Sequence, residues 1–164
     1  MPGHQRDLIT MTPQEVNAFL TDSRTATLAT VGPTGTPHLV AMWFALLDGA
    51  IWFESKAKAQ KIVNLRRDDR MTVLMEAGDT YDTLRGVSLE GRGVVDVDPD
   101  LMWAVGVGIW ERYTGPYTPE VKPFVEQMLH KRVVVRLEVE RTRSWDHRKL
   151  GLPTTAAAGS TGPH

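Results

Sequence analysis

The sequence predicts a mainly β protein of the α+β class, in which one curled antiparallel sheet of six strands carries peripheral helices. The first three β-rich segments are joined by turns of four to six residues, too short for the crossover of a dozen or more residues that parallel strands need. Glycines interrupt the longest predicted strand, as expected where a sheet bends. At 164 residues the chain is long enough to bury a hydrophobic core as one domain.

The first predicted element is a short helix that begins after Thr12. Thr12 and Glu15 have the spacing of a capping box, and Pro13 occupies the first helical position, where proline is favoured. Apolar side chains then recur at helical spacing: Val16, Phe19 and Leu20.

Three strands follow, at 24–31, 38–46 and 51–54. The glycine- and proline-rich segment 32–37 separates the first two, and the turn 47–50 separates the second from the third. We therefore expect these strands to form an antiparallel meander.

Residues 56–67 change to helical spacing, and 71–77 again has the pattern of a strand. A polar loop then leads to a longer strand at 87–97, which contains Gly91 and Gly93.

Two further helices and a last strand complete the predicted fold. One helix begins after Asp98 and ends before Gly115, and another begins after Thr118. The final strand, 133–141, alternates apolar and charged side chains. The predicted domain is 1–150, and residues 151–164, which are small and polar, are predicted to be a disordered tail.

Composition and charge exclude several kinds of function. The net charge of −1 provides no field to attract nucleic acid, the chain has no cysteine, and no apolar run approaches the roughly 18 residues of a membrane span. The N-terminus lacks the apolar region of a secretory signal, so we expect a cytoplasmic protein. We predict no metal site, because the histidines are scattered: His4, His38, His130, His147 and His164.

One segment has the residue types of an anion site. Ser55 is a suitable N-cap for the helix predicted at 56–67, and Lys58 and Lys61 are three residues apart, which places them on one helix face. A hydroxyl, free backbone N–H groups and two ammonium groups suit a phosphate ester. The alternative is an ordinary solvated helix face, with 66–70 forming surface ion pairs. Trp103 and Trp110, seven residues apart, favour packing in the core or at a subunit interface over stacking on a ligand.

Several segments together resemble the pyridoxamine 5′-phosphate oxidase-like superfamily of FMN-binding split barrels, over residues 12–150. They are the first strand, with Thr25 to Thr30, the turn into Pro37-His38-Leu39-Val40, and the run Lys61-x-x-Asn64-Leu65-Arg66-Arg67-Asp68. Within it, the chain is most similar to the F420-dependent reductases of actinobacteria.

The resemblance implies a six-stranded split β-barrel that forms a homodimer, with a flavin-type cofactor between the subunits. It implies that Lys61 contacts the cofactor phosphate, with Ser55 and Lys58 nearby. His38, Val40 and Met42 are expected to line the cofactor ring, and Trp145 is expected to approach the partner subunit's site. No catalytic residue is identified, because the cofactor supplies the hydride chemistry.

One departure from the superfamily pattern decides between cofactors. FMN-binding members usually have an arginine directly before the lysine, where this chain has Gln60. Loss of that bidentate phosphate contact favours coenzyme F420 over FMN. We therefore expect an F420-dependent reductase of a small organic molecule, with two alternatives: an FMN enzyme of the pyridoxamine-phosphate oxidase type, or a non-catalytic F420 carrier.

Overall fold

The computed structural model of the protein describes residues 4–155. These residues form two compact units. The first unit comprises residues 4–23, 74–88 and 142–155, and the second comprises 24–73 and 89–141.

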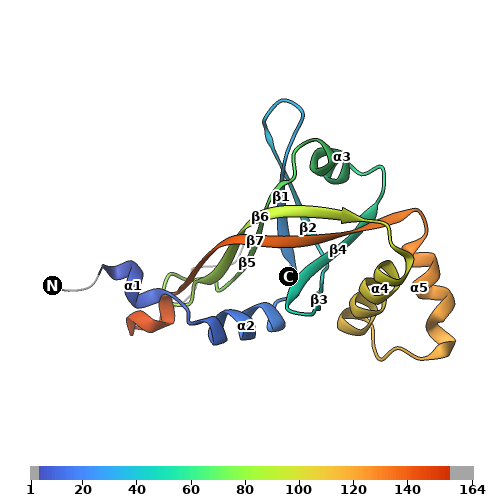
Figure 1. Ribbon diagram of the computed structural model, residues 1–164. Coiled ribbons are helices and arrows are strands. Elements are labelled where there is room, and N and C mark those ends of the chain that lie inside the picture. The colour runs from blue at the N-terminus through green and yellow to red at the C-terminus, as the bar shows by residue number, and fades with distance from the viewer. Residues whose placement is uncertain (1–3, 156–164) are drawn as a thin grey trace. The chain divides into compact units, whose positions relative to one another are not determined.

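Helices and strands follow one another in groups along the chain (Figure 1). The helices are α1 (Gln5–Ile9), α2 (Pro13–Asp22), α3 (Gln60–Arg67), α4 (Pro99–Tyr113) and α5 (Lys122–Leu129), with short 3₁₀ helices η1 (Pro119–Val121) and η2 (His147–Leu150). The strands are β1 (Ala26–Val31), β2 (Pro37–Met42), β3 (Ala45–Leu47), β4 (Ala50–Lys56), β5 (Arg70–Ala77), β6 (Arg85–Asp96) and β7 (Arg132–Asp146). Their order in the sheet is β2-β1-β5-β6-β7-β4-β3.

The predicted number of six strands is wrong, because the segment 38–46 forms two strands instead of one. β2 pairs with β1, whereas β3 pairs with β4 at the other end of the strand order. The chain breaks at Phe44, whose side chain is fully buried and whose backbone N–H donates to Tyr113 Oη in α4 at 3.2 Å. Two residues, Trp43 and Phe44, thus connect the edge strands, which requires the sheet of the second unit to curl. The predicted curled, mainly antiparallel sheet is confirmed.

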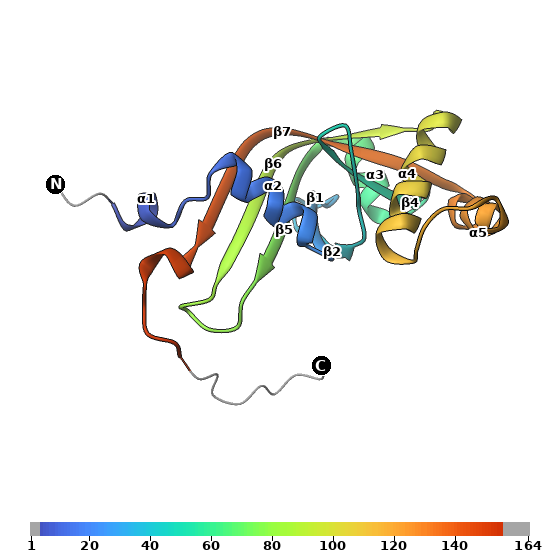
Figure 2. The ribbon, with the colours of Figure 1, turned by 90° about the horizontal axis from the view of Figure 1, so that it is seen from below.

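In the second unit, α4 and α5 lie side by side, as both Figures 1 and 2 show. One face of β3 and β4 packs against α4 in a cluster of buried side chains: Ala45, Trp52, Val105, Ile109 and Val134. Gly106 allows close packing of the two helices, since a Cβ there would lie 2.7 Å from Leu129 Cδ1.

The two helical tryptophans make ring contacts within the second unit. Trp103 meets the Tyr117 ring edge-on at 5.8 Å between centroids, and Trp110 stacks on Phe124 at 6.1 Å. Both tryptophans remain partly exposed.

The first unit contains α1, α2 and η2 together with the ends of β5, β6 and β7 (Figure 2). The capping box of α2 is confirmed, because the Glu15 backbone N–H donates to Thr12 Oγ1 and Glu15 Oε2 accepts from the Thr12 N–H. The structure adds α1 and η2, which the sequence did not predict and which pack on one another. Lys149 of η2 donates to the carbonyl of Thr10, the C-cap of α1, at 2.9 Å. It also pairs with Glu15 of α2 at 2.6 Å.

The last strand is longer at its C-terminal end than predicted, since β7 continues to Asp146. Residues 151–155 form neither helix nor strand, and the rest of the predicted tail, 156–164, lies outside the described residues. No helix in the described part of the chain is long and apolar enough to cross a membrane.

Candidate functional site

The junction between β4 and α3 differs from the prediction. Ser55 does not cap a helix, because β4 continues through Ser55 and Lys56, which pair with Val133 and Arg132 of β7. The Ser55 side chain is buried, and its hydroxyl donates to the Lys56 carbonyl at 3.4 Å. α3 begins only at Gln60, with Ala59 as its N-cap.

Lys58 is therefore exposed in the turn before α3, and the predicted sharing of one helix face by Lys58 and Lys61 is wrong. The sequence pattern failed here because pairing with a distant strand decides where β4 ends. Because the N-cap residue is Ala59, no side chain accepts a hydrogen bond from the first backbone N–H groups of α3.

Lys61 lies in the first turn of α3 and is half-buried. Within residues 4–155 its ammonium group has neither a hydrogen bond nor an ion pair. Burial, above all, lowers the pKa of Lys61; the nearby Arg132 guanidinium lowers this pKa further, and the Glu54 carboxylate opposes both effects.

Glu54 and Arg132 were not identified from the sequence. Arg132 Nε lies 3.1 Å from Glu54 Oε2, and the two side chains are only 30% and 13% exposed. Burial raises the pKa of Glu54, against the attraction of Arg132 and Lys61. We call Lys61, Glu54 and Arg132 the Lys61 cluster. The register of β4 with β7, a long-range property, brings Glu54 and Arg132 together.

An amide network with a buried centre holds α3 against β1. Gln60 Nε2 donates to Asn64 Oδ1 at 2.7 Å, and Asn64 Nδ2 donates to Thr30 Oγ1 at 3.0 Å. Asn64 is fully buried and Thr30 nearly so. The Gln60 amide is engaged in this network and carries no charge. The cationic residue in the first turn of α3 is Lys61.

The three predicted site residues of β2 share one face of the strand, as expected. His38, Val40 and Met42 are half-buried and pair with the buried Thr30, Leu28 and Ala26 of β1. His38 Nδ1 is buried and has no hydrogen-bond partner in the described part of the chain. Most buried polar atoms of native proteins have a hydrogen-bond partner, and a ligand or a water molecule can supply one.

Thr30 connects this strand face to α3. It lies opposite His38 in the β1–β2 ladder and accepts the hydrogen bond from Asn64 of α3. The second unit thus brings the His38 face close to the helix that carries Lys61.

Trp145 belongs to the first unit. It lies within β7 instead of after it, and its ring packs on Gly86, where a Cβ would be 2.3 Å from Trp145 Cζ2. Gly86 is therefore the residue that makes room for this tryptophan, a structural role that accounts for the ring's partial burial.

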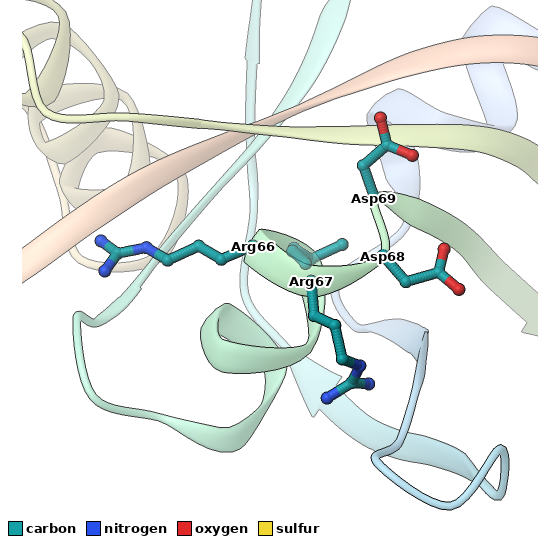
Figure 3. Close-up of a pocket in the computed structure, with 5 residues that line it drawn as sticks. Arg66, Arg67, Asp68 and Asp69 are labelled. Carbon is teal, nitrogen blue, oxygen red and sulfur yellow. The ribbon is translucent and has the colours of Figure 1, made fainter.

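A separate pocket, of about 640 Å³, is lined by Leu65, Arg66, Arg67, Asp68 and Asp69. Figure 3 shows the four charged side chains pointing away from one another instead of toward a common centre. Three of these charged groups have partners: Arg67 donates to the Val31 carbonyl, Asp68 pairs with Arg70 at 2.6 Å, and Asp69 pairs with Arg92. The pocket is therefore a less suitable anion site than the Lys61 cluster, and the predicted surface ion pairs are confirmed for Asp68.

The contribution of the Asp68–Arg70 pair to the stability of the fold is expected to depend on pH. Hydrogen bonds from Arg70 lower the pKa of Asp68 from 3.8 to about 2. A lowered pKa in the folded state means that the pair stabilises the fold above pH 3.8 and that this contribution is lost as the pH falls through about 2. Carboxyl chemical shifts followed by NMR are expected to show this low pKa, and Arg70→Gln is expected to return it toward 3.8. An unchanged Asp68 pKa in this variant would contradict the assignment.

Comparison with known proteins supports the resemblance seen in the sequence. Residues 12–146 match the pyridoxamine 5′-phosphate oxidase family. No curated protein matches the chain.

Solved structures show the same fold. A conserved hypothetical protein from Mycobacterium tuberculosis is 60% identical, with a TM-score of 0.93 over 97% of this chain and 99% of that one. An F420 reductase is 26% identical, with a TM-score of 0.58 over 77% of this chain and 94% of that one. An FAD-binding protein from Mesorhizobium loti, 18% identical, shares the fold with a TM-score of 0.60 over 82% and 93% of the two chains. The family match extends over most of the sequence and includes α3, β2 and Trp145, so the chain belongs to the pyridoxamine 5′-phosphate oxidase family.

Proposed function

We propose that this protein binds coenzyme F420 and uses its reduced form to reduce a small organic molecule by hydride transfer. The observation that carries the proposal is Lys61, a half-buried cation without a partner in the described chain, next to a helix N-terminus without a side-chain cap. A phosphate group supplies the charge and the acceptor oxygens that such a site lacks. The 26% identity with an F420 reductase supports the choice of cofactor.

In this proposal Lys61 binds the phosphate of the cofactor. Lys58 adds positive charge from the turn, and the buried Ser55 lies nearby at the end of β4. His38, Val40 and Met42 line the ring, with His38 Nδ1 available for a polar contact. The bound deazaflavin supplies the hydride chemistry, while the chain binds it, orients it and excludes water.

The structure of the α3 turn favours F420 over FMN. At the position where FMN-binding relatives usually have arginine, the Gln60 amide is occupied by Asn64 and contributes no charge. An F420 carrier without catalytic activity would use the same contacts. Tight binding of reduced F420 without its oxidation by any acceptor in a broad panel would favour that carrier function.

We also propose that the protein is a homodimer with the cofactor at the subunit interface and that Trp145 approaches the partner's site. On β2, the side chains opposite the His38 face are apolar and exposed: Pro37, Leu39 and Ala41. Leu39 is 64% exposed, and Trp43 beyond the strand is 57% exposed. Exposed apolar side chains that follow one another along a strand are typical of an interaction surface.

Leu39→Arg is expected to convert the dimer into a folded monomer, because it places a charge in the apolar interface at a position exposed in the single chain. Light scattering after size-exclusion chromatography measures the mass, and circular dichroism checks the fold. Glu126→Gln, on α5, serves as a control that is expected to remain dimeric. A wild-type monomer, or a Leu39→Arg variant that still dimerises fully, would contradict the proposed interface.

Lys61→Ala is expected to weaken F420 binding by about 1.5–3 kcal/mol, the range for hydrogen bonds to charged groups. The stability of the fold is expected to change little, because the Lys61 ammonium group has no partner in the described chain. Fluorescence titration measures the affinity, and thermal unfolding measures the stability.

Lys122→Ala is the matched control for this variant, because it removes an exposed lysine of α5 that forms a surface ion pair with Glu126. Its F420 affinity is expected to equal that of the wild type. Equal affinities for Lys61→Ala and Lys122→Ala would show that the phosphate does not bind at Lys61.

A further inference from the structure

We infer that the Lys61 cluster selects a phosphodiester over a phosphomonoester and that Glu54 is the residue that determines this specificity. The inference rests on the proposed function in one respect: the ligand binds through its phosphate at Lys61. It adds the chemical class of that phosphate and the residue that discriminates against the other class.

The Lys61 cluster carries one net positive charge. Arg132 and Glu54 form an ion pair at 3.1 Å with limited exposure, so their charges largely compensate each other. Within residues 4–155 Lys61 has no hydrogen bond or ion pair of its own, so two cations and one carboxylate leave a single uncompensated positive charge. Charges withdrawn from water need compensation by an equal and opposite charge.

Phosphodiesters and phosphomonoesters differ in charge. A phosphodiester carries one negative charge, which neutralises the cluster. A phosphomonoester carries about 1.5 to 2 negative charges at pH 7 and would leave surplus negative charge beside the Glu54 carboxylate. The surrounding protein already raises the pKa of that carboxylate by burial, so additional negative charge nearby is unfavourable.

Other cations near the junction do not remove this discrimination. Lys56, on β4, and Lys58, in the turn, are both exposed, so water and salt screen their interactions with a bound phosphate. Around Glu54, β7 contributes Arg132 and α3 contributes Lys61. Among the carboxylates of the described part of the chain, Glu54 is the one that acts on the pKa of Lys61.

Two riboflavin phosphates provide a matched test, because FMN is a monoester and riboflavin 4′,5′-cyclic phosphate is a diester with the same ring. Titration of the full-length wild-type protein is expected to show tighter binding of the cyclic diester. Glu54→Gln removes the carboxylate charge with little change in shape, and is expected to reduce this preference on the order of tenfold, mainly by tightening FMN. Glu126→Gln, an exposed carboxylate on α5, is expected to leave the preference unchanged.

A second pair of variants separates charge from folding. The double variant Glu54→Gln/Arg132→Gln keeps the net charge of the cluster and is expected to keep the wild-type preference. Arg132→Gln alone lowers that charge by one and is expected to widen the preference, which gives a test even if Glu54→Gln does not fold. A preference that is the same in every folded variant would overturn the inference.

Parallel titrations with F420 distinguish this inference from the proposed function. Weak F420 binding combined with the predicted diester preference would reject the cofactor and support the inference. Tight F420 binding with an unaltered preference in the variants would support the cofactor and reject the inference. A protein that binds F420 and both riboflavin phosphates negligibly would contradict both.

Discussion

Phe44→Ala is expected to lower the free energy of unfolding by about 3–5 kcal/mol, the range for removal of a buried phenyl ring. Phe44 is completely buried, and the Arg112 guanidinium lies 4.3 Å from the centre of its ring. Phe44 also lies where the chain passes from β2 to β3, so the cavity would weaken the connection between the edges of the curled sheet. Urea denaturation measures the change.

Phe124→Ala is the matched control, since Phe124 is 59% exposed on α5. Its loss is expected to be much smaller, because most of this ring is already in water and its main contact is the stack on Trp110. Equal losses for the two variants would mean that the β2–β3 connection does not depend on burial of Phe44.

Gly91→Ala is expected to cost about 3 kcal/mol, at the upper end of the range for overpacking. A Cβ at Gly91 of β6 would lie 1.9 Å from the Glu138 carbonyl oxygen and 2.9 Å from its carbon in β7. Both atoms belong to the backbone, so relief of the clash requires one strand to move away from the other.

Gly93→Ala provides the comparison within the same strand. A Cβ at Gly93 would meet the ends of flexible side chains, Leu65 Cδ2 at 2.8 Å and Met71 Sδ at 3.0 Å. These side chains have other rotamers available, so a smaller loss is expected in thermal or urea unfolding. A larger loss of stability in Gly93→Ala than in Gly91→Ala would show that the close approach of β6 and β7 does not explain why residue 91 is a glycine.

Features that depend on neighbours in the chain were predicted well. The capping signals at Thr12 and Asp98 begin helices in the structure as expected. The alternation along β2 placed His38, Val40 and Met42 on one face. Gly91 and Gly93 of the long strand were expected to mark a bend; at Gly91 the structure shows a close approach of β7 that leaves no room for a Cβ.

Features that depend on distant partners were missed. The break between β2 and β3 is stabilised by a hydrogen bond from Phe44 to Tyr113, 69 residues away. The extension of β4 through Ser55, which removed this residue as a helix cap, follows from pairing with β7. The same pairing brings Arg132 to Glu54, so the composition of the Lys61 cluster was not visible in local spacing.

We propose above that this member of the pyridoxamine 5′-phosphate oxidase family binds F420 through Lys61. The most direct test of this proposal is a fluorescence titration of the purified, cofactor-free protein with F420 and, separately, with FMN. We expect tight binding of F420, weak binding of FMN and a loss of F420 affinity in Lys61→Ala. Tight binding of FMN with weak binding of F420 would contradict the account and assign the protein to flavin chemistry on the same fold.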